Sequence, residues 1–407
     1  MSSEWLDCTL GDVLTLQRGM DLPVQDRSDG RYPVVASTGI VGYHSEGPVK
    51  GPGVVIGRSG SIGGGQFIER DFWPLNTTLW VKDFKGNDPR YCYYLLKSID
   101  FNSMNAGSGV PTLNRNHLHP IRILRAPLEA QKFIAGALGD LDDRITLLRE
   151  TNATLEAIAQ ALFKSWFVDF DPVCAKMEGR TPEGMDEATS ALFPDGFEMA
   201  EERKVPQGWH FAPVYELATY INGAAYKAFE PNTERRGLPI IKIAELKAGV
   251  TSQTAYSDVD MPSKYRIETG DILFSWSGNP DTSIDTFVWT QEEALLNQHI
   301  FRVLPHSSET RSFVLQTLRY LRPVFAELAR NKQTTGLGHV TVADMKRLLV
   351  VRPSSPVLTQ FDLVAGPIQQ RIFNNARQAQ ALCTLRDTLL PRLISGKLRL
   401  PEVQAAT

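Results

Sequence analysis

The chain has few cysteines, no long apolar run and almost no excess charge. Its 407 residues carry a net charge of −3 and include four scattered cysteines, Cys8, Cys92, Cys174 and Cys383. Without a CxxC pair they argue against a zinc module or a disulfide framework, and they favour reduced thiols in the cytosol. No stretch approaches the about 20 apolar residues of a membrane-spanning helix, and the N-terminus lacks a signal-peptide pattern. We therefore expect a soluble cytoplasmic protein of two or three domains.

Several catalytic motifs are absent as well. The sequence has no GxxxxGK[ST] phosphate loop, so no ATP-driven motor is expected in it. The segment "SGNPDTS" (277–283) contains Asn-Pro, but Asp281 and Thr282 stand where an adenine methyltransferase would need a second proline and an aromatic residue. His117 and His119 have no further ligands near them, which argues against a metal site. We predict no catalytic residues, no metal and no cofactor in this chain.

Charge is unevenly distributed. Residues 176–202 hold eight acidic and two basic side chains together with prolines and glycines, which predicts an exposed connector. Residues 302–352 hold nine basic and three acidic side chains, a net charge of 9 − 3 = +6. This second segment is interpreted either as a phosphate-facing surface or as helices with solvated charged faces.

The sequence repeats itself in order. Trp5 and Trp209 lie 204 positions apart, and "VVIGRSG" (54–60) precedes "ILFSWSG" (272–278) by 218. "LNTTLWV" (75–81) and "LNQHIFR" (296–302) are 221 apart, and "LEAIAQALFKSWF" (155–167) shares its apolar pattern with "LCTLRDTLLPRLI" (382–394) at an offset of 227. The conserved order predicts an internal duplication in which each copy is a domain followed by a helix.

Each domain copy has the pattern of a mixed α/β fold. "YPVVAST" (32–38), "GVVIGRS" (53–59) and "TTLWV" (77–81) predict strands in the first copy, and "LPIIKIA" (238–244), "DILFSWS" (271–277) and "DTFVWT" (285–290) the same strands in the second. A helix is expected after each set, at 89–99 and 310–321. The glycine-rich "GRSGSIGGG" (57–65) lacks a following helix-start signal, so it predicts a hairpin and not a dinucleotide-binding loop.

Apolar residues spaced 3-4-3-4 predict a seam along two long helices. The predicted spacer seam consists of Ile145, Leu148, Leu155, Leu162 and Trp166 in the first helix, and Ile372, Leu382, Leu389 and Leu393 in the second. So narrow a stripe needs a partner helix, and a pseudo-twofold relation would make the pair antiparallel. About 28 residues would give a rod of about 42 Å. The alternative is that each helix packs into its own domain.

The expected fold class is therefore α+β. Two similar mixed α/β domains are separated by a long antiparallel two-helix coiled coil that arose by pseudo-twofold duplication. The predicted boundaries are 1–138 for the first domain, 139–170 for the first spacer helix, 171–204 for the acidic connector, 205–357 for the second domain, 358–400 for the second spacer helix and 401–407 for a tail.

Three segments carry a resemblance to a known family. "SWFVDFDPVCAKMEGRTPEGMDEATSALFP" (165–194), "VPQGW" (205–209) and "LLPRLISGKL" (389–398), together with the domain–helix–domain–helix order, resemble the specificity subunit of type I restriction–modification systems. The resemblance covers essentially the whole chain. It implies that each domain is a target-recognition domain for one half of a bipartite DNA sequence.

The same resemblance implies partners and a division of labour. Two modification subunits would bind the helices, carry S-adenosylmethionine and methylate adenine in double-stranded DNA. Motor-nuclease restriction subunits with ATP and Mg²⁺ would cleave unmodified DNA, and this chain would be non-catalytic. The alternatives are a self-contained methyltransferase or nuclease, and a regulatory or decoy scaffold that binds modification subunits without reading DNA.

Candidate DNA contacts are polar residues on loops that interrupt the strands. In the first copy they are Lys50, Arg58, Ser59, Asn76, Thr77, Asn105, Ser108, Asn114 and Arg115. In the second they are Ser275, Trp276, Asn297, Gln298, His299, Lys332, Gln333, Thr334 and His339. Each could instead stabilise its own loop. The aromatic residues Trp166, Phe167 and Phe170 are expected either to bind a partner subunit or to close the end of the coiled coil.

Overall fold

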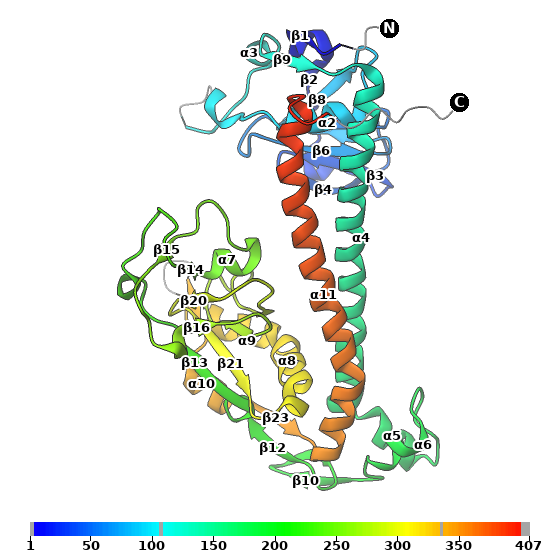
Figure 1. Ribbon diagram of the computed structural model, residues 1–407. Coiled ribbons are helices and arrows are strands. Elements are labelled where there is room, and N and C mark those ends of the chain that lie inside the picture. Colours follow the sequence, from blue (N-terminus) through cyan, green and yellow to red (C-terminus); the bar gives the residue numbers. More distant parts are fainter. Residues whose placement is uncertain (1–3, 106–108, 334–336, 400–407) are drawn as a thin grey trace, which may run out of the picture. The chain divides into compact units, whose positions relative to one another are not determined.

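The computed structural model describes residues 4–105, 109–333 and 337–399 (Figure 1). The chain divides into two compact units, one formed by Met1–Thr146 with Gln380–Thr407 and the other by Leu147–Ala379. The predicted tail, 401–407, lies outside the described residues. None of the described helices is long and apolar enough to cross a membrane.

The first unit is built on a four-stranded antiparallel sheet of order β2-β8-β5-β6. A three-stranded sheet, β4-β3-β7, and the pair β1-β9 complete it. Its elements are β1 (Leu6–Thr9), α1 (Leu10–Val13), β2 (Thr15–Arg18), β3 (Tyr32–Ala36), β4 (Gly39–His44), β5 (Gly53–Gly57), β6 (Gly63–Ile68), β7 (Trp73–Pro74), β8 (Thr78–Asp83), α2 (Pro89–Lys97), α3 (Arg115–Leu118) and β9 (Arg122–Arg125).

The second unit contains a matching four-stranded sheet of order β13-β21-β17-β19. Its elements are α5 (Asp171–Met177), α6 (Glu187–Ala191), β10 (Phe197–Ala200), β11 (Arg203–Pro206), β12 (His210–Pro213), β13 (Ala218–Asn222), β14 (Leu238–Ile241), α7 (Ile243–Ala248), β15 (Tyr256–Ser257), β16 (Arg266–Ile267), β17 (Ile272–Ser275), β18 (Ser277–Gly278), β19 (Asp285–Val288), β20 (Ala294–Leu296), β21 (Ile300–Pro305), α8 (Arg311–Tyr320), α9 (Arg322–Arg330), β22 (Gly338–His339), α10 (Val342–Arg347) and β23 (Leu349–Arg352).

The register of the two sheets confirms the duplication. Arg18 of β2 lies opposite Leu79 of β8, and Asn222 of β13 lies opposite Phe301 of β21. β3 pairs in parallel with β7 as β14 does with β20, and β1-β9 has its counterpart in β12-β23. The first strand of each sheet is followed by a glycine, at 19 and 223, where an added Cβ would lie 2.2 Å from a backbone carbonyl oxygen of the facing segment. Only glycine allows this approach.

Two details of the predicted alignment are wrong. The strand "TTLWV" (β8) corresponds to β21, as the repeat of 75–81 at 296–302 predicted, and not to "DTFVWT" (β19), which takes the edge position of β6. Leu79 and Phe301 pair with equivalent residues of the first strand of each sheet, so the offset between β8 and β21 is 222 and not 221. Apolar pattern alone could not separate these strands, because all are short and β-branched or aromatic. The glycine-rich segment forms the predicted hairpin, in which β5 pairs antiparallel with β6.

The two long helices are α4 (Leu128–Phe167) and α11 (Ser355–Ile394), each 40 residues long. Both begin before the predicted starts at 139 and 358, and both end before the predicted ends. The first turns of α4 bury Ile134 and Leu138 in the core of the first unit, and those of α11 bury Val357 and Phe361 in the core of the second. These residues were assigned to the domains because their apolar pattern serves the domain cores and not the seam.

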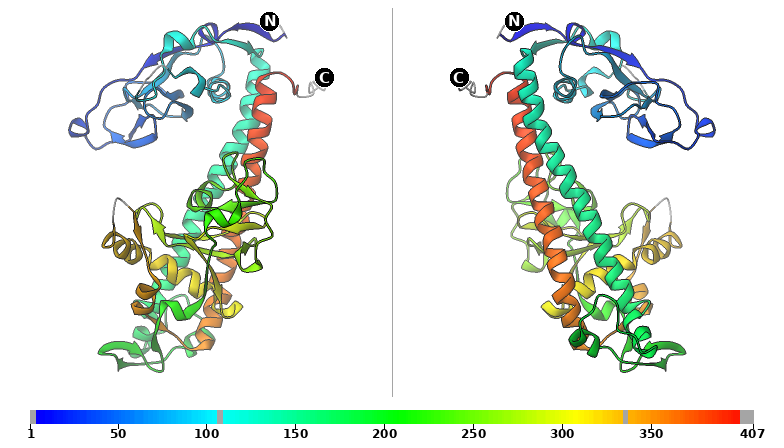
Figure 2. Two further views of the ribbon diagram at one scale, coloured as in Figure 1. Left: turned by 90° about the vertical axis from the view of Figure 1, so that its left-hand side faces the viewer. Right: turned by 90° about the vertical axis from the view of Figure 1, so that its right-hand side faces the viewer.

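Within each unit the two helices lie side by side and antiparallel (Figures 1 and 2). In the second unit Asn152 contacts Asn375 while Phe163, farther along α4, contacts Phe361, which lies earlier on α11. All predicted seam residues are buried or half-buried: Ile145, Leu148, Leu155, Leu162, Trp166, Ile372, Leu382, Leu389 and Leu393. Both predicted arrangements therefore hold, because the helices form a seam and also pack into the domains.

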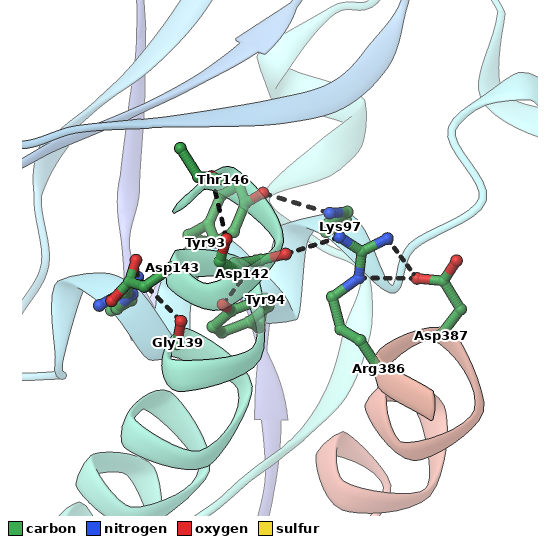
Figure 3. A network of polar contacts seen from close by, with 10 residues as sticks. Tyr93, Tyr94, Lys97, Gly139, Asp142, Asp143, Thr146, Arg386 and Asp387 are labelled. Atoms are coloured by element: carbon green, nitrogen blue, oxygen red, sulfur yellow. Dashed lines mark hydrogen bonds and ion pairs between the residues drawn. The ribbon is translucent and has the colours of Figure 1, made fainter. Parts of the chain in front are cut away.

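In the first unit, polar groups join α2, α4 and α11 (Figure 3). Asp142 on α4 accepts a hydrogen bond from the Tyr94 hydroxyl at 2.7 Å and from Arg386 Nη1 on α11 at 2.6 Å. Burial and the bond to Asp142 raise the pKa of Tyr94, which keeps its hydroxyl protonated as a donor. Arg386 also binds the neighbouring Asp387. The carboxylate thus ties a domain helix to both long helices.

The acidic segment after α4 is mostly exposed, as predicted, but it is folded and packs on the second unit. It forms α5, α6 and the hairpin β10-β11, and it buries Val173, Phe193 and Val205 in the core of the second unit. The acidic side chains alternate with these apolar residues and remain on the surface, so composition alone suggested a linker.

Candidate nucleic-acid interface

An open hollow of about 670 Å³ marks the polar surface of the first unit, at the end of β2 and beside β5. It is lined by Gln17, Arg18, Gly19, Asp21, Arg58, Leu79, Thr112, Leu113, Asn114 and Arg115. Three of the predicted contacts, Arg58, Asn114 and Arg115, therefore meet at one place. Gln17 and Arg18 were missed by sequence reasoning. The signal that could have found them is their position directly before the repeated glycine.

Arg58 is held in position by its own backbone and by that of its neighbours. Its N–H donates to Thr77 O and its carbonyl accepts from Leu113 N, both at 2.8 Å. Its Nε donates to Asn76 O at 3.0 Å. Partial burial and the nearby Arg18 lower the pKa of Arg58. The side chain is thus fixed at its Nε, with a second guanidinium close by.

Other predicted residues of the first unit hold this surface together. The Asn76 side-chain amide donates to the Asp21 carboxylate, and Thr77 Oγ1 accepts from Ser37 N at 3.3 Å. Ser59 pairs with Thr112 in an isolated bridge. These three predicted contacts act first as loop supports.

The remaining first-unit candidates are exposed or lie elsewhere. Lys50 forms an ion pair with Asp71 at 2.7 Å. Asn105 is exposed, and its Oδ1 accepts from Thr112 N at 2.9 Å. Asn114 caps α3, and Arg115 begins that helix with an exposed side chain. Ser108 lies outside the described residues.

Trp276 occupies the position of Arg58 in the second unit. Its N–H donates to His299 O at 3.3 Å, and its carbonyl accepts from Val340 N at 2.8 Å, which repeats the backbone pairing of Arg58. The indole Nε1 donates to Asn222 Oδ1 at 3.1 Å, and the ring lies 5.7 Å from that of His299. Asn222 itself corresponds to Arg18. The second unit therefore presents a neutral, aromatic surface where the first presents two arginines.

Two predicted contacts of the second unit are wrong. Ser275 is fully buried and Asn297 is 4% exposed, so neither reaches a ligand at the surface. The strand register explains this, because Ser275 ends β17 with its side chain turned into the core. Gln298 and His299 are half-buried with their side-chain nitrogens 3.3 Å apart, and His339 is exposed on β22 opposite Ser277.

The remaining candidates of the second unit are Lys332, Gln333 and Thr334. Lys332 Nζ forms an ion pair with Asp344 at 2.5 Å and supports the start of α10. Gln333 is exposed, and Thr334 lies outside the described residues.

In the basic segment 302–352, for which a phosphate-facing surface was one of two interpretations, much of the charge is neutralised within the second unit. Most of its cations are paired with acids of the same unit: Arg302 with Asp271, Arg319 with Glu156, Arg322 with Asp285, Arg330 with Asp281 and Lys332 with Asp344. The net charge of the segment overstates its unpaired charge because four of these five partners, all except Asp344, lie elsewhere in the sequence.

The aromatic cluster at the end of α4 closes the end of the helix pair. Trp166 and Phe167 are 5% and 4% exposed, and their rings pack against Phe361 of α11 at 5.6 and 4.9 Å. The prediction that they bind a partner is wrong for these two residues. Phe170 is half-buried against Phe197 and Trp209.

Comparison with known proteins agrees with the duplicated architecture. The family described as "Type I restriction modification DNA specificity domain" matches residues 2–157 and 206–373, so its match covers both copies. The chain belongs to this family. Over 348 residues this chain is 26% identical to the type I restriction enzyme MjaIX specificity subunit of Methanocaldococcus jannaschii. The match covers 81% of this chain and 74% of that protein.

Two further relatives resemble this specificity chain. It is 26% identical over 316 residues to the HindI specificity subunit of Haemophilus influenzae, covering 66% of this chain and 67% of that protein. The crystal structure of a type I restriction–modification system S subunit from M. genitalium has a TM-score of 0.56 and 17% identity, with 96% of each chain covered. This last likeness shows that the fold is shared.

Proposed function

We propose that this specificity chain reads a bipartite sequence in double-stranded DNA, one half with each domain. The observation that carries the proposal is the equivalence of Arg58 and Trp276. The same backbone framework presents different side chains at the same place in the two units. A duplicated scaffold with exchanged surface residues suits two readers of different half-sites, because base edges are read by side chains.

The long helices set the unread gap in this proposal, since both contribute to the core of each unit. They also bind the modification subunits. In the second unit Leu147 and Ile158, about three turns apart on α4, are 51% and 44% exposed, and Leu363 on α11 is 65% exposed. Apolar side chains that stay exposed on a paired helix suit a further protein surface.

In this proposal the partner subunits catalyse the reactions. Two modification subunits bring S-adenosylmethionine and methylate adenine, and restriction subunits with ATP and Mg²⁺ cleave unmodified DNA. This chain is non-catalytic and acts in the cytoplasm with the DNA. Support comes from the family match and from the sequence, which contains neither a phosphate loop nor a methyltransferase motif.

Methylation of a DNA library by the purified chain, with and without modification subunits, tests this function. We expect methylation only with the partners, confined to one bipartite sequence, and binding that weakens steeply with salt as phosphate contacts are lost. Methylation by the chain alone would make it an enzyme. Partner binding without any effect on DNA affinity would make it the alternative, a regulatory scaffold.

A further inference from the structure

We propose that Arg18 and Arg58 together recognise a guanine in the half-site of the first unit, and that the second unit lacks this recognition. The proposal rests on the proposed function and assigns a base to one of its two reading surfaces. It starts from the charge in the hollow of the first unit. The described residues that line it supply three guanidinium groups, from Arg18, Arg58 and Arg115, and one carboxylate, from Asp21.

The two central arginines lack an acidic partner among the described residues. Asp21, the only acid among the described residues that line the hollow, accepts a hydrogen bond from the Asn76 amide. Arg18 is exposed at the end of β2, and it is close enough to Arg58 to lower the pKa of that side chain. Two adjacent like charges without a carboxylate between them are unfavourable in the free protein. They become favourable when a ligand supplies acceptor atoms.

The geometry of Arg58 selects the kind of acceptor. Its Nε donates to Asn76 O at 3.0 Å, which restrains the guanidinium, and the two Nη groups donate to none of the described residues. A fixed pair of donors suits two acceptors side by side, and guanine presents such a pair, O6 and N7, in the major groove. A phosphate oxygen shares the acceptor chemistry but would be bound equally at every sequence.

The equivalent place in the second unit offers no such donors. Trp276 and Asn222 stand where Arg58 and Arg18 stand, and the indole Nε1 is already bonded to Asn222 Oδ1. The indole ring suits apolar contact, as with the methyl group of thymine, and the Asn222 amide supplies one donor nitrogen and not a guanidinium fork. The guanine preference therefore belongs to one half of the target only.

The test is methylation of DNA with randomised half-sites by the complex assembled with modification subunits. We expect the wild-type complex to require guanine at one position of one half-site. Arg58→Gln and Arg18→Gln should lower the preference for that guanine by about tenfold to hundredfold and leave the other half-site unchanged. Arg58→Lys keeps the charge without the planar fork, so it should keep the affinity and lose most of the preference. Arg70→Gln, an exposed arginine of the same unit outside the hollow, should change neither.

Three results would overturn the proposal. A uniform loss of methylation at all sequences, with a shallower salt dependence, would mean that the arginines bind phosphate. An unchanged preference, or a change in the other half-site, would remove them from this reading role. A wild-type complex without any sequence preference would instead defeat the proposed function itself. Thermal unfolding of each variant shows whether it is folded. If a glutamine variant is unfolded, Arg58→Lys provides the decisive comparison.

Discussion

At the residue scale, Asp142 connects three helices of the first unit through Tyr94 and Arg386 (Figure 3). The side chains of Arg386 and Asp142 are 15% and 21% exposed, so the ion pair is screened less than a surface pair. Removal of Arg386 leaves Asp142 partly buried without its counter-charge, whereas Arg386 would keep Asp387 if Asp142 were removed. Such uncompensated groups cost more than the pair contributes.

Arg386→Ala should therefore destabilise the first unit by about 2 kcal/mol or more, because Asp142 loses a charged donor. Hydrogen exchange of the backbone amides in α2 and at the start of α4, followed as a function of urea concentration, measures this change in the free energy of unfolding. Arg371→Ala, at an exposed position of the same helix, should change it by less than about 0.5 kcal/mol. Equal effects of the two variants would show that the network contributes nothing.

Asp344 gives the second unit a dependence on pH. Burial alone would raise the pKa of Asp344, but hydrogen bonds from Lys332 and Thr341 outweigh it and hold the pKa below its usual range. Because the folded pKa is below the unfolded value, the carboxylate stabilises the fold at neutral pH. That stabilisation is lost as the pH falls through the folded pKa.

Asp344→Asn should lower the stability of the second unit by about 2 kcal/mol at pH 7, and the difference from wild type should shrink below about pH 4. Urea unfolding over pH 3 to 7 measures it. Asp195→Asn, at an exposed acid of the same unit, should give a small and constant difference. A gap for Asp344→Asn that stays constant or widens with acid would contradict this assignment.

Residue placement was the least predictable part of the site. Arg58 was found because it lies near the end of a predicted strand, and Arg18 was missed because no strand was predicted at residues 15–18. Ser275 and Asn297 were placed on the surface although they are buried, since polarity does not reveal which way a strand residue turns. These differences depend on register, which arises only from the pairing of distant strands.

At the scale of elements, the helix seam contains one hydrogen-bonded asparagine pair. Asn375 Nδ2 donates to Asn152 Oδ1 at 2.9 Å, and Asn152 Nδ2 donates to Ile372 O at 3.0 Å. At the repeat offset of 227, Asn152 corresponds to Ala379 and Asn375 to Leu148. A seam between two copies of the same helix would therefore place each asparagine against an apolar residue. A buried asparagine of this kind lowers stability and selects the correct pairing.

Asn375→Leu alone should destabilise the chain by about 1–3 kcal/mol, since the Asn152 carbonyl loses its donor. The double variant Asn152→Leu/Asn375→Leu should recover that stability and form self-associated species through like helices. Thermal unfolding and analytical ultracentrifugation separate the two effects. Asn374→Leu, an exposed neighbour, is the control. A double variant that stays monomeric would show that the asparagines do not select the pairing.

The helices and strands were predicted more accurately than the residues at which they begin and end. The seam was correct because its apolar period is long and regular, and the short strands were correct because glycines bound them. The helix starts were wrong because Ile134 and Leu138 on α4 belong to a domain core, and the acidic segment was taken for a linker because its buried residues are few.

At the scale of the whole molecule, we propose that the two helices set the gap between the half-sites. Their seam residues come from both halves of the chain, so a change of length must be made in both helices to keep the pairing. The matching places are between residues 146 and 147 in α4 and between 379 and 380 in α11, where the two compact units divide.

Insertion of one matched heptad at both places is the most direct test. Seven residues add about 10 Å of helix, close to three base pairs of DNA. Sequencing of the bases methylated by the assembled complex should show an unread gap that is longer by about three base pairs, with the bases of both halves unchanged. A gap of unchanged length in a folded, active complex would contradict the claim that the helices measure it.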